Sequence, residues 1–135
     1  MGNLTVIIRT APTTCWSCGA ETTIVSSLLL TGAKDHAECA VADFLEYPTL
    51  IDVVNRAVSD QKDVGAVKPR FSKTLTQGYM SNGCFRCDAL FGQHFEIHAR
   101  YGEREAARLD VPISGEWAEV FQRLLSSEDG HLFHF

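Results

Sequence analysis

Two cysteine pairs constrain the fold of this 135-residue chain more than any other feature. Cys15 and Cys18 enclose two residues, and so do Cys84 and Cys87. A tight turn with this spacing directs both sulfurs toward one ion, and tetrahedral zinc takes four such ligands at about 2.3 Å. Two turns fill all four positions and leave none for water. The pattern therefore predicts one structural Zn²⁺ bound by Cys15, Cys18, Cys84 and Cys87.

The residue after each pair supports two similar turns. A chain often leaves such a turn in a left-handed conformation, which glycine adopts freely and aspartate tolerates better than most residues. Gly19 and Asp88 occupy these positions. Sixty-five residues lie between Cys18 and Cys84, far more than in a short zinc finger. Metal binding would therefore join remote parts of the chain and contribute to the stability of the fold.

Extended segments are expected around each pair. The β-branched and apolar runs at 4–9 and 22–30 predict strands that flank the first pair, the former ending near Pro12. Residues 70–82 read as a hairpin with a glycine in its turn, which leads into the second pair. The two halves of the zinc site are thus expected at about residues 1–30 and 70–100.

Helical periodicity begins after the first half. The pattern from about residue 35 to residue 61 predicts a helical insertion, which Pro48 divides into two helices. Thr49 is expected to cap the second of them. Residues 61–69 then read as a loop. A C-terminal helix is expected at about 115–127, where Trp117, Val120, Phe121, Leu124 and Leu125 recur at helical spacing.

Residues 89–101 fit both a helix and a strand, and we favour a helix. The elements together predict one α+β domain over residues 1–135, in which zinc-ribbon-like hairpins carry an inserted helical segment and a C-terminal helix. Helices are expected to cover the sheet.

Charge is distributed unevenly along the chain. The net charge is −5, yet residues 62–100 contain six Lys and Arg against three Asp and Glu. These basic residues could contact phosphates, although ordinary solvated surface gives a similar imbalance and is the preferred interpretation. They are Lys62, Lys68, Arg70, Lys73, Arg86 and Arg100.

The expected cellular location follows from two kinds of segment that we do not find in the sequence. No apolar run approaches the roughly 20 residues needed to span a bilayer, and the first residues do not resemble a secretion signal. A cytoplasmic location without membrane attachment is expected. Structural disulfides are rare there, and paired thiols more often bind metal or do redox work.

The other candidate groups give weaker patterns. Redox chemistry usually places the first cysteine of a pair at a helix N-terminus, which neither pair indicates. Cys39 reads as a small buried residue of a helix. His94 and His98 would share a helix face, but Phe95 stands where a metalloprotease needs Glu, and packed histidines are the preferred interpretation. We assign no catalytic residue.

Aromatic residues follow the first cysteine of each pair. Trp16 and Phe85 occupy equivalent positions, and Arg86 follows Phe85. If exposed, these side chains could stack on bases or anchor a protein partner. If buried, the two rings would shield the metal in an apolar jacket, which is the interpretation we favour.

The two turns with their flanking strands resemble a zinc ribbon. A second resemblance, to a group of small uncharacterised bacterial proteins with paired zinc knuckles, covers roughly residues 12–25 and 70–96. It rests on Phe71-Ser72-Lys73-Thr74, Tyr79, Asn82, Cys84, Cys87, Ala89-Leu90, Gly92 and Phe95. That group favours Pro-His between the second cysteines and Gly after them, where this chain has Phe85-Arg86 and Asp88. This difference leaves the four cysteine ligands in place, but the resemblance does not imply that this chain shares a partner with that group.

Zinc ribbons in general serve as adaptors for protein or nucleic acid, and the resemblance implies such a role. We therefore expect a structural-zinc binding or regulatory protein that acts as a protein-interaction module without catalysis. Trp16, Phe85 and Arg86 are the expected partner-binding residues. A zinc-ribbon nucleic-acid-binding protein is the alternative, and a thiol-redox or metal-dependent enzyme comes third. The sequence does not indicate an oligomeric state.

Overall fold

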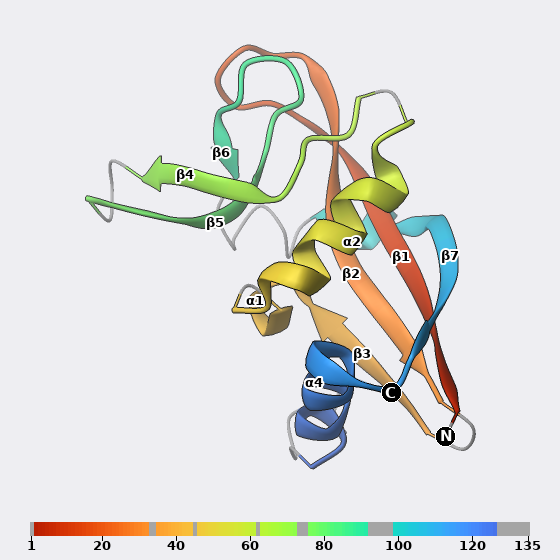
Figure 1. Ribbon diagram of the computed structural model, residues 1–135. Helices are drawn as coiled ribbons and strands as arrows, with labels where there is room; N and C mark the ends of the chain where they lie inside the picture. The colour runs from red at the N-terminus through yellow and green to blue at the C-terminus, as the bar shows by residue number, and fades with distance from the viewer. Residues whose placement is uncertain are drawn as a thin grey trace.

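Two antiparallel sheets and a small number of helices make up the part of the chain that the structure describes (Figure 1). The computed structural model describes residues 2–32, 35–44, 46–61, 63–72, 76–91 and 99–126. This arrangement confirms the predicted α+β class. Within these ranges, no helix is long and apolar enough to cross a membrane.

The larger sheet has four strands in the order β3-β2-β1-β7. They are β1 (Asn3–Thr14), β2 (Glu21–Thr31), β3 (His36–Ala40) and β7 (Arg104–Pro112). As predicted, β1 and β2 flank the first cysteine pair. β1 continues through Pro12, where we expected it to end. Its pairing with β7 stops at Thr10, so Pro12 lies where the missing N–H removes no bond to that neighbour.

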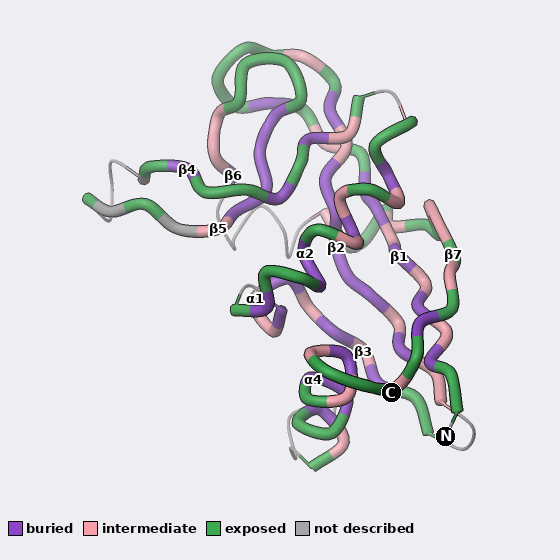
Figure 2. The backbone as a smooth tube through the Cα atoms, in the orientation of Figure 1, coloured by how far each residue is buried: buried purple, intermediate pink, exposed green. Residues whose placement is uncertain are grey.

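Helices cover one face of this sheet (Figure 1). They are α1 (Val41–Phe44), α2 (Pro48–Val58) and α4 (Gly115–Ser126). Buried residues of α2, α4, β1 and β2, purple in Figure 2, belong to one apolar core. It includes Leu4, Val6, Ile8, Leu28, Leu30, Leu50, Val54, Val58, Trp117, Val120, Phe121 and Leu124. The predicted helices at the end of the insertion and at the C-terminus are therefore confirmed.

The start of α2 differs from its prediction. Pro48 occupies the first turn rather than interrupting a helix, because its missing N–H needs no partner there. Tyr47, not Thr49, is the N-cap residue, and it contributes no side-chain cap bond. The Leu50 N–H instead donates to the Glu116 carboxylate at 3.1 Å, which fixes α2 to the start of α4.

Two strands replace what the sequence predicted as helix or left unassigned. The insertion was expected to be helical from Asp35, but residues 36–40 form β3, with Cys39 opposite Leu28. Alternation of buried Ala37 and Cys39 with half-exposed Glu38 is a strand pattern, and the available edge of β2 selects it. The strand β7 was not predicted, and its pairing partner β1 lies at the other end of the sequence.

A β-bulge divides β2 into two parts. Arg9 pairs with Ser27 and Thr10 with Val25, so Ser26 is an extra residue. Because paired residues face the same side, Val25 stays on the helix-covered face and Ile24 points to the opposite face. Ile24 belongs there to a second cluster of buried residues, which also contains Cys15, Cys84 and Phe91.

The smaller sheet has the order β4-β5-β6 and carries the second cysteine pair. Its strands are β4 (Lys68–Ser72), β5 (Gln77–Gly83) and β6 (Leu90–Phe91). The predicted hairpin is present as β4–β5 and extends away from the larger sheet (Figure 1), but Gly78, expected in its turn, lies in β5 opposite Phe71. The helix favoured for residues 89–101 is wrong at its start, because Leu90 and Phe91 pair with β5. A 3-10 turn, η1 (Arg100–Gly102), ends that segment.

Candidate metal centre

The first cysteine pair lies in a tight turn between β1 and β2. The Cys15 N–H donates to the Ala20 carbonyl at 2.8 Å, and the Gly19 N–H donates to the Cys15 carbonyl at 3.0 Å. Gly19 has φ +76°, the left-handed conformation expected from the sequence. These bonds close the loop on Cys15 and leave its sulfur facing inward, since Cys15 is 2% exposed.

The second pair repeats the first turn bond for bond. The Cys84 N–H donates to the Ala89 carbonyl and the Asp88 N–H to the Cys84 carbonyl, each at 3.0 Å. Asp88 has φ 64° in the position of Gly19. The left-handed residue predicted after each pair is therefore present in both turns. We call residues 15–19 and 84–88 the first and second knuckle.

Backbone N–H groups in each knuckle point at the first sulfur. Cys15 Sγ accepts from the N–H of Ser17 at 3.3 Å and of Cys18 at 3.5 Å. Cys84 Sγ accepts from Arg86 and Cys87 at the same two distances. Such donors stabilise a negative sulfur. Two segments that are remote in sequence thus form the same thiolate environment.

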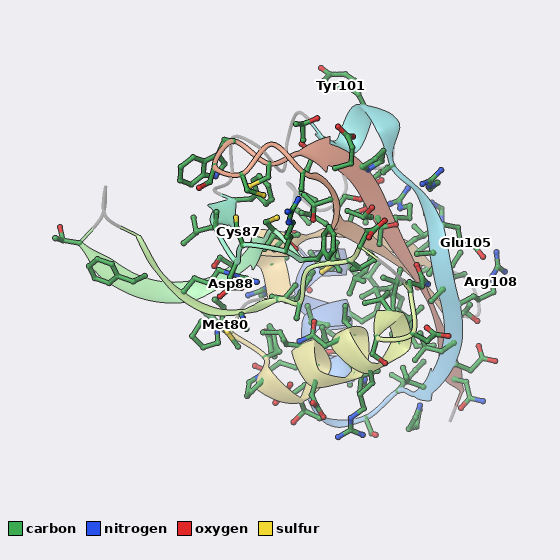
Figure 3. The ribbon with its side chains drawn as sticks, turned by 90° about the horizontal axis from the view of Figure 1, so that it is seen from above. Met80, Cys87, Asp88, Tyr101, Glu105 and Arg108 are labelled. Carbon is green, nitrogen blue, oxygen red and sulfur yellow. The ribbon has the colours of Figure 1, made fainter. Side chains whose placement is uncertain are left out.

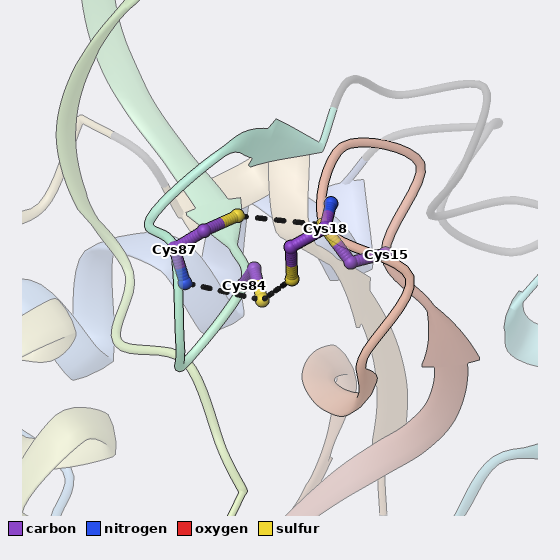
Figure 4. Close-up of side chains that lie close together, drawn as sticks. All are labelled: Cys15, Cys18, Cys84 and Cys87. Atoms are coloured by element: carbon purple, nitrogen blue, oxygen red, sulfur yellow. Dashed lines mark hydrogen bonds between the residues drawn. The ribbon is translucent and has the colours of Figure 1, made fainter.

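The four sulfurs form one compact cluster (Figure 4). All four ligand atoms lie within 4.8 Å of one another. Between knuckles, Cys15 Sγ lies 3.6 Å from Cys87 Sγ, and Cys18 Sγ lies 3.8 Å from Cys84 Sγ. Ligands at 2.3 Å from a tetrahedral centre are separated by about 3.8 Å. These spacings fit a bound ion, and all four cysteines are free of disulfide bonds.

Protein contacts bring the knuckles together. The Phe85 N–H donates to the buried Thr22 hydroxyl at 3.1 Å, and the Asn82 amide donates to the Val25 carbonyl at 2.8 Å. Gly65 lies between the two segments: its N–H donates to the Thr23 carbonyl at 3.0 Å. These bonds link β2 directly to the chain around Cys84.

The thiols influence one another. Although burial acts to raise the pKa of Cys84, the N–H groups of Cys87 and Arg86 and the neighbouring thiols lower it to about 6. For Cys87 the Ala89 N–H acts to lower the pKa, but desolvation and the other three thiols raise it to about 11. One thiol of the cluster therefore loses its proton readily, and the negative charge that results opposes deprotonation of the next thiol. A dication at the centre would remove that repulsion and allow four thiolates.

The fifth cysteine is chemically separate. Cys39 is fully buried on the helix-covered face of β3, and burial raises the pKa of its thiol far above the ordinary value. It packs as a small apolar residue, as predicted, although on a strand rather than a helix. A thiol that remains protonated and inaccessible is neither a metal ligand nor a nucleophile.

The Asp88 carboxylate in the second knuckle forms ion pairs with two basic side chains. Arg70 Nε and Nη2 lie 3.0 and 2.9 Å from Asp88 Oδ1, and Lys68 Nζ lies 3.0 Å from it. Burial acts to raise the pKa of Asp88, but these two cations lower it. Lys68 and Arg70 were predicted as surface cations that could contact phosphates. The buried Arg70 instead also donates to the Ser81 carbonyl and fixes the hairpin to the knuckle.

The predicted partner-binding residues lie on the surface beside the sulfurs. Trp16 is 59% exposed and Phe85 43% exposed, and Arg86 is exposed. The favoured interpretation that both rings are buried as a metal shield is therefore wrong. The indole N–H of Trp16 donates to the Leu90 carbonyl at 2.9 Å, so the ring lies across from the first knuckle to β6.

Other predicted candidates are not informative here. His94, His98, Lys62 and Lys73 lie outside the described residues. Sequence analysis also missed a polar cluster on the larger sheet, where Glu103 accepts the hydroxyls of Ser26 at 2.7 Å and Ser27 at 2.9 Å. The bulge at Ser26 brings both hydroxyls to one carboxylate, and no local pattern in the sequence predicts this bulge.

Comparison with protein-family models, curated proteins and solved structures finds no match to this chain.

Proposed function

We propose that the chain binds one Zn²⁺ through Cys15, Cys18, Cys84 and Cys87 as a structural ion, in a zinc-ribbon-like arrangement of two knuckles. The compact cluster of four sulfurs carries this proposal, since their spacing fits tetrahedral ligands and N–H donors stabilise two of them as thiolates. Four protein ligands leave no coordination position for a substrate. The role that follows is structural rather than catalytic.

Metal analysis of the purified, reduced protein tests the ion. Zinc at one equivalent per chain is expected, and tetrahedral sulfur sites otherwise hold iron, which would colour the protein. Purified chain without a transition metal, and without affinity for added Zn²⁺, would refute the site. A cytoplasmic location stays a prediction from the sequence.

We further propose that the zinc site serves a protein-interaction module. Trp16 and Phe85 are large exposed apolar side chains on the two knuckles, and Arg86 adds a cation between Phe85 and a ligand. Aromatic residues and arginine are the side chains that most often dominate binding energy at protein interfaces. The metal would hold these groups in a fixed relation by joining the knuckles.

Nucleic acid remains the second candidate partner, because exposed Trp16 and Phe85 beside Arg86 could stack on unpaired bases. The charges of the chain favour nucleic acid less than protein as the partner. Lys68 and Arg70 are both engaged by Asp88, and the whole chain has a net charge of −5. A salt-dependent change in tryptophan fluorescence on adding single-stranded DNA or RNA would favour this candidate.

A paired set of variants tests the protein-binding role. A partner captured from the native host by the zinc-loaded chain should be lost with Trp16→Ala and Phe85→Ser together. Tyr101→Ala is the matched control, since Tyr101 is 91% exposed and points away from the rest of the molecule (Figure 3). Equal capture by all three proteins would rule out the knuckle surface as the interface.

A further inference from the structure

The four sulfurs are not equivalent in their access to solvent. Cys15 is 2% exposed and Cys84 is 1% exposed, whereas Cys18 and Cys87 are exposed. Each knuckle therefore contributes one buried and one exposed ligand. The second cysteine of each pair is therefore the one that a reagent in solution can approach more easily.

Hydrogen bonding strengthens this difference. The buried sulfurs of Cys15 and Cys84 each accept two backbone N–H groups of their own knuckle. In the zinc-bound cluster all four sulfurs are thiolates, and N–H donors that lower the pKa of a thiolate also lower its nucleophilicity. Cys18 and Cys87 are consequently the more accessible nucleophiles of the cluster because of their exposure, although Cys87 also accepts the Ala89 N–H.

Each exposed sulfur also faces a buried sulfur of the other knuckle. Cys87 Sγ lies 3.6 Å from Cys15 Sγ, and Cys18 Sγ lies 3.8 Å from Cys84 Sγ. A disulfide bond is about 2.05 Å long, so a movement of less than 2 Å per pair would form one. The oxidised form of either exposed cysteine thus has a second thiolate directly beside it.

We propose that Cys18 and Cys87 form an oxidation site for hydrogen peroxide, and that its product is a disulfide between the two knuckles with release of the metal. This inference rests on the proposed zinc site. It concerns bond formation between knuckles, Cys15 with Cys87 or Cys18 with Cys84, rather than within one cysteine pair.

The chemistry requires one peroxide and two protons. The exposed thiolate attacks peroxide, the O–O bond breaks, and the products are a sulfenic acid and hydroxide, which becomes water. The facing thiolate then attacks the sulfenic sulfur, the S–S bond forms, and the S–O bond breaks to release a second hydroxide. Two thiolates lose two electrons and the peroxide gains them. The ion loses two anionic ligands and dissociates.

The position of the new bond determines what oxidation does to the protein. A disulfide within one knuckle would leave the two knuckles joined only by noncovalent contacts once the metal departs. A disulfide between knuckles keeps Trp16 and Phe85 on a joined scaffold while it removes the ion and changes the charge between them. The surface would respond to peroxide without separation of the two segments.

Peptide mapping distinguishes these bonds because trypsin cuts after Arg86, between Cys84 and Cys87. Residues 10–34 contain Cys15 and Cys18, residues 74–86 contain Cys84, and residues 87–100 contain Cys87. Full-length zinc-loaded protein is treated with hydrogen peroxide, blocked with N-ethylmaleimide and digested without reductant. Released zinc is measured in parallel with a chromogenic chelator.

The expected result is one zinc released per chain, together with peptide 10–34 linked to 74–86 or to 87–100. A link between 74–86 and 87–100, an internal disulfide in 10–34, or metal retained after oxidation would each overturn the inference. Metal content before peroxide reports the zinc site by itself. A chain that binds no zinc therefore fails the proposed function, whereas a zinc-loaded chain with the wrong linkage fails only this inference.

Two controls use the remaining thiols. Cys39 lies in the peptide 35–56 and is fully buried, so its thiol should stay unmodified while zinc is released. Cys39→Ala should give the same linkage and rate as the unchanged protein. Simultaneous oxidation of Cys39 would indicate unfolding and would contradict selective reaction at the exposed sulfurs.

Discussion

Gly65 packs tightly between β2 and the segment that leads into the second knuckle. A Cβ atom on this residue would lie 1.9 Å from the Gly83 carbonyl oxygen and 3.3 Å from the Phe85 nitrogen. Gly83 directly precedes Cys84. Because contacts below 3.0 Å do not occur for real Cβ atoms, Gly65→Ala must move the second knuckle away from β2 by roughly 1 Å.

The cost follows from two opposing effects. Overpacking of a close-packed site costs about 1–3 kcal/mol, and replacing glycine by alanine returns about 0.4–1 kcal/mol through the unfolded chain. The obstacle here is backbone, which cannot rotate away, so we expect a net loss near the upper end, about 2 kcal/mol. At an unfolding entropy of about 2.1 cal/mol/K per residue, this loss lowers Tm by about 7 °C for a chain of this length.

Thermal unfolding of the zinc-loaded variants measures this effect. Gly78→Ala is the matched control, because a Cβ at Gly78 meets only the Arg70 carbonyl oxygen at 3.7 Å. Its Tm should stay the same or rise slightly. Gly65→Ala should also bind zinc more weakly in competition with a chelator, since one knuckle is displaced. An unchanged Tm for Gly65→Ala, or an equal loss in Gly78→Ala, would refute the argument from close approach.

Three further predictions concern the metal and its surroundings. Cys84→Ser should lower zinc content and Tm together, and full occupancy with unchanged melting would exclude a structural clamp. Arg70→Met should cost about 1–3 kcal/mol in denaturant unfolding, because Asp88 and the Ser81 carbonyl lose a buried donor; Lys68→Met removes a half-exposed pair and should cost less than about 1 kcal/mol. In the metal-free reduced protein the Cys84 thiol, with its pKa of about 6, is deprotonated at pH 7 and protonated at pH 5. Zinc binding should therefore release about one more proton at pH 5 than at pH 7, which calorimetry in buffers of different ionisation enthalpy measures, and equal release at both values would contradict the lowered pKa.

The four-cysteine cluster could be predicted because its information is local. Each knuckle needs only two cysteines at fixed spacing and a residue that tolerates positive φ, and Gly19 and Asp88 supply it. The pairing of the two knuckles followed from the demand of one ion for four ligands. Helices α2 and α4 were predictable for a similar reason, since their apolar residues recur at helical spacing within a single segment.

Features that depend on distant neighbours were not predictable in the same way. Residues 36–40 became a strand because the edge of β2 offers hydrogen bonds, and β7 formed against β1 from the opposite end of the chain. The exposure of Trp16 and the pairing of Arg70 with Asp88 likewise depend on the position of the small sheet. A single sequence specifies these contacts only through the complete fold.

The extra residue Ser26 makes β2 serve two apolar interiors in succession. Leu28 and Leu30 belong to the interior beneath the helices, and uninterrupted alternation would send Ile24 there as well. With one more residue in the strand, Ile24 instead packs beside the sulfurs. Pairing without the bulge, with Ser26 opposite Thr10, would turn every side chain from Val25 to Glu21 to the other face of the sheet, so the bulge is what places Ile24 beside the metal centre.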